Sequence, residues 1–513
     1  MAGTGSRWRD PGPWALGAWG ALVAVAAFPP AVLGPLAPVL PAPLWALAIR
    51  CEARRGFLLG WIQGLGFFGA LLWWIAPTVA RYGGLPWPAA VGCVALLAAY
   101  LALYPGACGW VCSAVGRKNP GLALALAPFV WTGLEGVRGW ALTGFPWGDV
   151  AQALWNQPLA LRLAPWVGAD GIRLVGVGLA VAPAWLLARG DVSVRVLAVP
   201  AAAALAWAGL ALAPSPLQPA DATLRVGVVQ GNIDQAQKWD RAYRRITLDI
   251  YERLTLDLGP RRPKLVVWPE TAVPLNVQDS GPEASRLLTL ARRTGAWLLF
   301  GAPGYERVGG RMEYRNSVFL LTPSGTWAGR YDKVHLVPFG EYVPFGRYLP
   351  FLKKMVEGAG DFSPGPGAIP LSSPGLPTLG PLICFEGIFP GPAARHAEQG
   401  ARLLVVVTND AWFGQTPAPY QHLAFAALRA AETGLPLVRA ANTGVSAVFD
   451  RRGRPLTTTV LGARDAFVAE VELPSAGPTP QAAVRPWISP ASLALAALSV
   501  FAILRGPRRA PRT

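Results

Sequence analysis

The chain has 513 residues, of which 52% are hydrophobic and 15% are charged, and its formal net charge is +17. This composition is too apolar for an ordinary soluble protein and predicts a membrane protein. Between Asp221 and Arg485 lie 23 of the 29 acidic and 29 of the 46 basic residues, a balance of +6, so the flanking sequence carries +11. Basic flanks with long apolar runs are typical of membrane topology, so we expect no nucleic-acid partner.

Eight apolar runs predict eight transmembrane helices, because most of them approach the roughly 20 residues that a helix needs to cross a bilayer. The runs are Trp14–Phe28, Ala31–Ile49, Phe57–Ala76, Pro88–Val115, Gly121–Val137, Val167–Leu187, Val196–Ala213 and Ile488–Leu504. The first run also has features of a signal peptide, but Ala26-Ala27-Phe28 is a poor cleavage site. We therefore expect a retained helix.

Basic residues in the short loops predict the orientation of these helices. With a cytoplasmic N-terminus, thirteen Lys and Arg residues fall on the cytoplasmic side and four on the other side. Both termini are then cytoplasmic, and in a bacterium with two membranes the polar region lies in the periplasm. The predicted domains are a seven-helix transmembrane domain over 1–214, a polar periplasmic domain over 221–485 and a C-terminal inner-membrane helix over 487–505.

The polar domain alternates short apolar runs with segments of helical periodicity, which predicts an α/β sandwich with a site at its strand ends. The expected strands are Leu224–Gln230, Leu265–Trp268, Trp297–Gly301, Leu382–Phe385, Leu403–Thr408 and Leu437–Ala440. The expected helices are Arg241–Leu258, Glu283–Arg293 and Gln421–Thr433, and Asn316–Thr322 with Gly325–Tyr331 predicts a hairpin.

The cysteines predict neither a disulfide framework nor a metal site. Four of the five lie in or beside apolar segments, and Cys384 is alone in the polar domain. Cys108 and Cys112 are one helical turn apart without a nearby histidine, which indicates packing residues. We expect no metal and no cofactor.

Three reactive side chains each stand at or just after the end of an apolar strand: Glu270, Lys333 and Cys384. A thiol attacks as its thiolate, so it needs a base and a nearby cation. We expect Glu270 to be the base and Lys333 the cation, and Lys333 with the backbone N–H of Phe385 to bind the oxyanion in an acyl transfer. Taken singly, each residue would also fit a structural role.

The order of these residues resembles the nitrilase superfamily, which carries a Glu-Lys-Cys triad on an αββα sandwich. More narrowly, the chain is similar to the bacterial apolipoprotein N-acyltransferases, the membrane branch of that superfamily. The matching stretches are Val229–Ile233 with Lys238-Trp239, Trp268–Thr271, Tyr331–Pro344, Ile383–Glu386 and Thr408–Gly414. The resemblance covers nearly the whole chain and predicts an α+β membrane protein with a nitrilase-like catalytic domain.

The resemblance implies that Cys384 is the nucleophile and forms a thioester. It also implies supporting roles for Glu341 and Glu386 and an active-site role for Trp239, although packing of Trp239 and a structural salt bridge of Glu386 stay open. The family often has Tyr where this chain has Phe385, a change that removes a hydroxyl but keeps the backbone N–H.

Aromatic residues among prolines and glycines follow Lys333, from Phe339 to Phe351, and two lysines come directly after them. Such a segment suits a bilayer interface. We expect Phe339, Tyr342 and Phe345 to bind substrate on a mobile lid that dips into the membrane; the alternative is a packed surface loop.

The histidines and a glycine-rich run add no further chemistry. His335, His396 and His422 lack ligand spacing, and a cation at Lys333 disfavours a Cys-His pair with His335, so we expect none of them to be catalytic. Gly301–Gly304 lacks the features of a phosphate-binding loop.

The resemblance implies a two-step exchange in which a monomeric enzyme moves a fatty acyl chain from a phospholipid, with phosphatidylethanolamine as the expected donor. The acceptor is the N-terminal amine of diacylglyceryl-cysteine in an apolipoprotein, the final step of lipoprotein maturation. One alternative is a membrane-tethered amidase that uses the same triad with water as acceptor. Another is a transporter or scaffold, which would bury ionisable residues in its spans, whereas Asp149, Asp170 and Arg173 stand near the outer end of a segment.

Overall fold

The computed structural model describes residues 12–188, 194–236, 238, 241–279, 281–343 and 362–505. The chain forms two compact units. The helical unit comprises Met1–Trp73, Val91–Pro214 and Ala483–Thr513, and the sandwich unit comprises Trp74–Ala90 and Ser215–Ala482.

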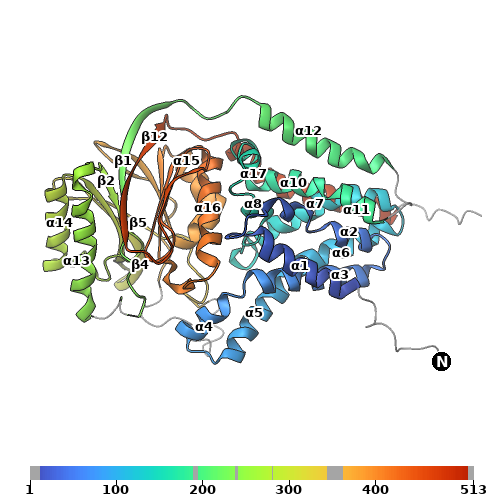
Figure 1. Ribbon diagram of the computed structural model, residues 1–513, viewed down its shortest axis with the longest axis horizontal. Helices are drawn as coiled ribbons and strands as arrows, with labels where there is room; N and C mark the ends of the chain where they lie inside the picture. Colours follow the sequence, from blue (N-terminus) through green and yellow to red (C-terminus); the bar gives the residue numbers. More distant parts are fainter. Residues whose placement is uncertain are drawn as a thin grey trace, which may run out of the picture. The chain divides into compact units, whose positions relative to one another are not determined.

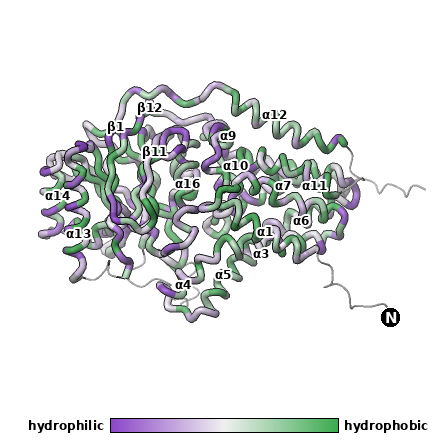
Figure 2. The backbone as a smooth tube through the Cα atoms, viewed as in Figure 1, coloured by the Kyte–Doolittle hydropathy of each residue, from purple (hydrophilic) through white to green (hydrophobic). Residues whose placement is uncertain are grey.

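The helical unit consists of mainly apolar helices (Figure 2). The helices are α1 (Gly12–Ala27), α2 (Ala42–Ala48), α3 (Ala53–Leu71), α5 (Trp87–Leu101), α6 (Leu103–Gly116), α7 (Pro120–Arg138), α8 (Val150–Ala153), α9 (Pro158–Leu161), α10 (Ala164–Leu179), α11 (Val181–Ala188), α12 (Ala198–Leu212) and α17 (Gln481–Arg505). α3 and α6 approach so closely that a Cβ at Gly60 would lie 2.1 Å from the carbonyl oxygen of Pro105. Glycine is therefore required there.

Five helical segments of the described chain are long and apolar enough to cross a membrane: Trp87–Gly116, Pro120–Arg138, Ala164–Ala188, Val194–Leu212 and Gln481–Ala502. The number rises to six if α3 and α4 (Ile75–Gly83), which are bent by 57°, count as one span. The first two predicted spans are shorter apolar helices within Gly12–Ala27 and Gly34–Ala48, and the second contains 3-10 turns at its prolines. The count of eight spans stays a prediction.

The sandwich unit packs two six-stranded sheets face to face, with the strand orders β12-β1-β2-β3-β4-β5 and β11-β10-β9-β8-β7-β6. The strands are β1 (Ala220–Gln230), β2 (Leu265–Val267), β3 (Trp297–Val308), β4 (Arg311–Leu321), β5 (Trp327–Asp332), β6 (Leu371–Ser373), β7 (Leu376–Ile383), β8 (Leu403–Thr408), β9 (Leu437–Ala441), β10 (Ala447–Phe449), β11 (Pro455–Thr458) and β12 (Asp465–Pro474). Buried Val and Leu side chains of both sheets fill the space between them.

Helices cover the outer faces of the two sheets (Figure 1). α13 (Arg241–Asp257) and α14 (Pro282–Thr294) pack on the first sheet through residues such as Leu248 and Leu287. α15 (Pro390–Glu398) and α16 (Ala418–Thr433) lie on the second sheet. The layers are therefore αββα, as the sequence predicts.

The predicted strands are present, but two end earlier than predicted: β2 ends at Val267, one residue before Trp268, and the strand before the nucleophile is also shorter. Leu382–Phe385 is not all strand, because β7 ends at Ile383 and a 3-10 helix, η5, runs from Cys384 to Ile388. Cys384 has φ +52°, which extended backbone does not allow. The strand therefore ends one residue before the thiol.

The segment 74–90 belongs to the sandwich unit, although the sequence prediction includes it in the first domain. α4 contacts the loop after β8, where the Thr78 hydroxyl donates to the Trp412 carbonyl oxygen at 2.9 Å. Trp74, directly before α4, donates its indole N–H to Gln421 Oε1 of α16 at 3.2 Å. These contacts lie within the sandwich unit and join α4 to it.

Candidate functional site

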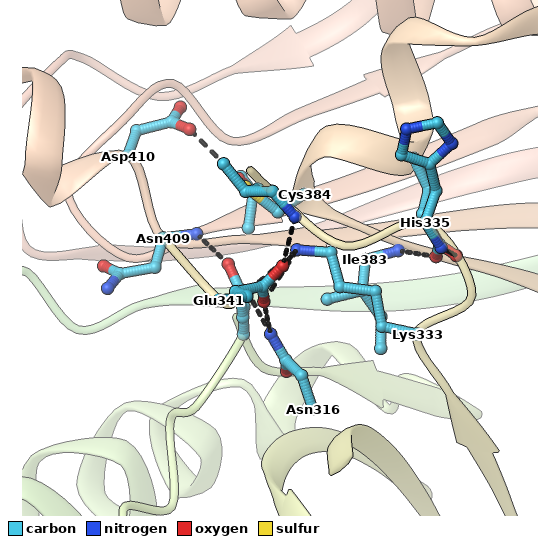
Figure 3. Close-up of polar contacts among 12 residues, drawn as sticks. Asn316, Lys333, His335, Glu341, Ile383, Cys384, Asn409 and Asp410 are labelled. Atoms are coloured by element: carbon cyan, nitrogen blue, oxygen red, sulfur yellow. Dashed lines mark hydrogen bonds and ion pairs between the residues drawn. The ribbon is translucent and has the colours of Figure 1, made fainter. Parts of the chain in front are cut away.

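Three strand ends bring the predicted reactive residues to one place. Figure 3 shows Lys333 and Cys384 there, with Glu341, Asn316 and Asn409 around them. Glu270 follows β2, Lys333 follows β5 in the same sheet, and Cys384 follows β7 in the facing sheet. The sandwich joins residues that are more than fifty positions apart in the sequence. Glu270 and Lys333 are buried, and Cys384 is half-buried at the rim of the core between the sheets.

Glu270 accepts hydrogen bonds from neutral donors at both carboxylate oxygens. Asn316 Nδ2 lies 2.7 Å from Oε1, and the backbone N–H of Asn409 lies 2.9 Å from Oε2. The ammonium of Lys333 is farther away, 3.9 Å from Oε1. Glu270 is therefore held in place without a tight ion pair.

Lys333 makes its tight ion pair with Glu341 instead. Its Nζ lies 3.0 Å from Glu341 Oε1 and 2.9 Å from Oε2, and the Lys333 side chain is 1% exposed. Asn316 Nδ2 also donates to Glu341 Oε1, so one amide bridges the two carboxylates. Burial lowers the pKa of Lys333, but the charges of Glu341 and Glu270 outweigh it and raise the pKa, so the ammonium stays charged.

Cys384 is held in a strained backbone conformation and has a weakly acidic thiol. Its φ of +52° lies in the left-handed region, which costs a non-glycine residue roughly 1–3 kcal/mol. Burial, then the Glu270 carboxylate, raise the pKa of the thiol to about 12, against the lowering effects of Lys333 and the Thr408 hydroxyl. The thiol therefore carries its proton at neutral pH and needs a base when it attacks.

Glu386 ties the nucleophile turn to the segment that carries Lys333. Its carboxylate accepts from the Tyr331 hydroxyl at 3.0 Å, from the backbone N–H groups of Val334 and His335, and from the N–H of Ile383 at 2.8 Å. Burial raises its pKa, and these backbone donors oppose that shift. Among the described residues, no cation lies within salt-bridge distance of Glu386. Its contacts are therefore hydrogen bonds, and not the structural salt bridge that the sequence left open.

Asn316, Asn409 and Lys238 also line the site, and sequence interpretation assigned them no role. Lys238 is 2% exposed, and its Nζ donates to the backbone carbonyl oxygen of Glu270 at 3.1 Å. Burial lowers its pKa to about 8, while the charges of Glu270 and Cys384 oppose the shift. Asn409 and Lys238 stand in the stretches that carry the family resemblance, and that was the only signal available for them.

A buried polar network lies behind the nucleophile, on β8, β9 and α16. Arg439 Nη2 donates to Asp410 Oδ2 at 2.6 Å, and Thr408 Oγ1 donates to Asp410 Oδ1 at 3.0 Å. Burial acts to raise the pKa of Asp410, but the charges of Arg439 and His422 lower it to about 2. His422 contacts both Asp410 and the backbone of Cys384.

The predicted substrate-binding residues are only partly described. Phe339 is 39% exposed, has φ +63°, and donates its backbone N–H to the Tyr342 carbonyl oxygen at 2.8 Å, which closes a turn beside Glu341. Trp239 and Phe345 lie outside the described residues, as does most of the predicted lid. The described chain contains no cluster of three or more His, Cys, Asp or Glu side chains that would hold a metal ion.

His335 and His396 lie away from the reacting groups. His335 stacks on Phe389 with ring centroids 4.1 Å apart, next to the ring of Phe385. His396 is buried on α15, and its Nε2 lies 2.8 Å from the Pro381 carbonyl oxygen.

Comparison with known proteins gives matches to both parts of the chain. The carbon-nitrogen hydrolase family matches residues 225–481, and the apolipoprotein N-acyltransferase N-terminal domain matches residues 20–182. A solved amidase from Nesterenkonia sp. AN1 is 22% identical, with a TM-score of 0.36, over 49% of this chain and 93% of that one.

Curated relatives extend over most of the chain. The apolipoprotein N-acyltransferase of Geobacter metallireducens is 38% identical over 462 residues, 88% of each protein. The enzyme of the same name from Methylococcus capsulatus is 35% identical over 467 residues, 90% of each. Since both domain models and these full-length relatives agree, the chain belongs to the apolipoprotein N-acyltransferase family and is a membrane acyltransferase with a nitrilase-like catalytic domain.

Proposed function

We propose that Cys384 takes a fatty acyl group from a phospholipid and passes it, as a thioester, to the N-terminal amine of diacylglyceryl-cysteine in an apolipoprotein. The observation that carries this proposal is the arrangement around Glu270. This carboxylate is bound by neutral donors and 3.9 Å from Lys333, in the same site as a thiol that keeps its proton until a base takes it. The substrates are those that the family's name and chemistry imply.

In the first half of the reaction, Glu270 takes the thiol proton as Cys384 Sγ attacks the ester carbonyl carbon. The carbonyl oxygen of the ester becomes an oxyanion, which Lys333 and the backbone N–H of Phe385 stabilise. The C–O bond to glycerol then breaks, and the leaving oxygen takes the proton from Glu270. Lyso-phospholipid departs, and the acyl group stays on sulfur.

In the second half, the acceptor amine attacks the thioester carbonyl and gives its proton to Glu270. The same two donors stabilise the second oxyanion. The C–S bond breaks, the thiolate recovers the proton, and an amide has formed. Because one site serves both halves, the base needs to bind and release a proton twice per turnover, which suits a carboxylate without a tight cationic partner.

The remaining assignments are part of the same proposal. The enzyme is a monomer in the bacterial inner membrane with cytoplasmic termini and a periplasmic sandwich unit, and phosphatidylethanolamine is its donor. Glu341 positions Lys333, and Glu386 positions the turn of Cys384. Phe339 and Tyr342, with Trp239 and Phe345, bind acyl chains.

Mass spectrometry of the purified protein after incubation with labelled phosphatidylethanolamine tests the mechanism. We expect an acyl adduct on Cys384, its transfer to a diacylglyceryl-peptide, and loss of both in the Cys384→Ala variant. Free fatty acid as the sole product, with no transfer to the peptide, would instead support the amidase alternative. Cells that rely on the Cys384→Ala variant and still make triacylated lipoproteins would disprove the proposal.

A second experiment tests the aromatic residues. Replacing Phe339 and Tyr342 together by Ser should impair acylation by phospholipid more than acylation by a short soluble thioester. Replacing Tyr243, an exposed aromatic residue on α13, by Ser serves as the control. Equal loss on both donors would count against a role in binding acyl chains.

A further inference from the structure

His422 is the only described side chain that joins the Asp410–Arg439 ion pair to the backbone of the nucleophile. It is 2% exposed on α16, and its Nε2 lies 3.2 Å from the Cys384 carbonyl oxygen. Its Nδ1 lies 3.0 Å from Asp410 Oδ1 and 3.3 Å from Arg439 Nη2. The imidazole therefore bridges a fixed ion pair and the residue that reacts.

A hydrogen bond to the Cys384 carbonyl oxygen requires a hydrogen on His422 Nε2. Arg439 Nη2 has two hydrogens, one for Asp410 Oδ2 and one for His422 Nδ1, and a neutral ring that accepts at Nδ1 carries its hydrogen on Nε2. The imidazolium form also carries a hydrogen there. In both forms Nε2–H donates to the Cys384 carbonyl oxygen. A ring protonated only on Nδ1 would donate to Asp410 Oδ1 and leave Nε2 and the Cys384 carbonyl oxygen as two acceptors 3.2 Å apart. A ring protonated only on Nε2 leaves Nδ1 and Asp410 Oδ1 as two acceptors 3.0 Å apart, with Arg439 Nη2 as the donor to Nδ1.

That carbonyl belongs to the same peptide unit as the N–H of Phe385. The peptide unit is planar and trans, so its C=O and N–H point in opposite directions, and holding one end fixes the direction of the other. Phe385 is the second residue of η5, and the first N–H groups of a helix have no acceptor within that helix, which makes this N–H a candidate donor to a ligand. Cys384 has φ +52°, in the left-handed region, and a non-glycine residue keeps that conformation only when contacts such as the one from His422 hold its backbone.

We propose that His422 is a positioning residue that, braced by Asp410 and Arg439, orients the backbone N–H of Phe385 toward the oxyanion. It acts through the peptide plane and touches neither the sulfur nor the substrate. The inference rests on the proposed function, because it needs an oxyanion at Cys384. This role differs from that of the histidine in a Cys-His pair, because the imidazole contacts the carbonyl oxygen of Cys384 and not its thiol.

Two reactions of the same thiol test this role. Acylation by phosphatidylethanolamine passes through an oxyanion, whereas alkylation by iodoacetamide does not. The variants His422→Met and His422→Gln have similar length, but only Gln offers an N–H donor. His396→Met is the matched control, because His396 is also a buried histidine whose Nε2 contacts a carbonyl oxygen near Cys384, that of Pro381. Both rates are followed by mass spectrometry of the Cys384 peptide.

His422→Met should slow acylation by about tenfold or more, while alkylation stays near the wild-type rate. His422→Gln and His396→Met should acylate at close to the wild-type rate. Unchanged acylation in His422→Met, equal slowing of both reactions, or a Gln variant as slow as Met would each overturn the proposal. If His422→Met does not accumulate, His422→Asn, which is too short to reach the carbonyl, replaces it. A wild-type protein without any acyl adduct would refute the proposed function itself.

Discussion

The helical unit and the sandwich unit both bury tightly paired charged side chains, but the catalytic site of the sandwich unit also holds one loosely paired carboxylate, Glu270. In the helical unit Arg173 Nη2 lies 2.7 Å from Asp149 and 2.6 Å from Asp170, and Arg138 is paired with Glu135. In the catalytic site the Lys333–Glu270 distance is 3.9 Å. Tight pairing neutralises a charge and holds a fold together, whereas loose pairing leaves a carboxylate able to accept a proton.

The comparison also bears on the transporter alternative. From the sequence, Asp149, Asp170 and Arg173 stand near the outer end of a segment, but the structure buries Arg173 and Asp149 among helices. Arg173 is paired with the Asp149 carboxylate and also donates a hydrogen bond to the Thr132 carbonyl oxygen. Such a cluster is a structural connection between α7, the start of α8 and α10.

The largest effect should follow from removing the loosely paired carboxylate. Glu270→Gln removes the base, so acyl transfer should fall roughly 10²–10⁴-fold. Alkylation of Cys384 should become faster at a given pH, because the Glu270 charge raises the thiol pKa and its loss lowers it. In the wild type, with a pKa of about 12, the alkylation rate should rise with pH without a plateau below about pH 10. A wild-type plateau near pH 7 would contradict this account.

Replacing Lys333, the cation of the site, should lower the rates of both acyl transfer and alkylation of Cys384. Lys333→Met loses an oxyanion donor, so acyl transfer should fall about 10²–10³-fold. Because Lys333 lowers the thiol pKa, its loss raises that pKa and slows alkylation as well. Lys264→Met, at an exposed lysine of the same unit, is the control. Faster alkylation in Lys333→Met would reverse the electrostatic assignment of the two residues.

Breaking the tight cluster of the helical unit should affect stability instead of chemistry. Arg173→Met leaves buried carboxylates without their cation, which costs about 3–5 kcal/mol in the free energy of unfolding. Thermal unfolding in detergent measures the loss, with the exposed Arg162→Met as control. Alkylation of Cys384 below the unfolding temperature should stay at the wild-type rate. A melting temperature equal to that of the control would show that the cluster contributes little.

The smallest effect is expected at the partner of Lys333. Glu341→Gln weakens a charge-assisted contact of 2.9–3.0 Å without removing either triad member, so acyl transfer should fall about tenfold. Glu306→Gln, at a carboxylate that is 54% exposed in a rim ion pair, should change little. A loss as large as that of Glu270→Gln would mean that Glu341 takes part in proton transfer.

Several features of the site were predictable because their causes are local. Apolar runs of strand length predict β1, β2, β8 and β9, since a buried strand must be apolar on both faces. The reactive residues directly after such runs are recognisable for the same reason, and strand ends of a sandwich meet at common edges. The apolar runs likewise predict a membrane protein, because bilayer thickness sets their length.

Only the tertiary structure decided how these residues pair. Nothing in the sequence pattern indicates that Lys333 binds Glu341 more tightly than Glu270, because that depends on how the segment after β5 folds back on itself. Nor does it indicate that Asn316 and Asn409 hold Glu270, because those contacts join different strands. The left-handed conformation of Cys384 and its contact with His422, 38 residues away, also depend on how α16 packs on its sheet. Hydropathy and spacing encode burial along one segment, whereas hydrogen-bond geometry depends on atoms brought together from several segments.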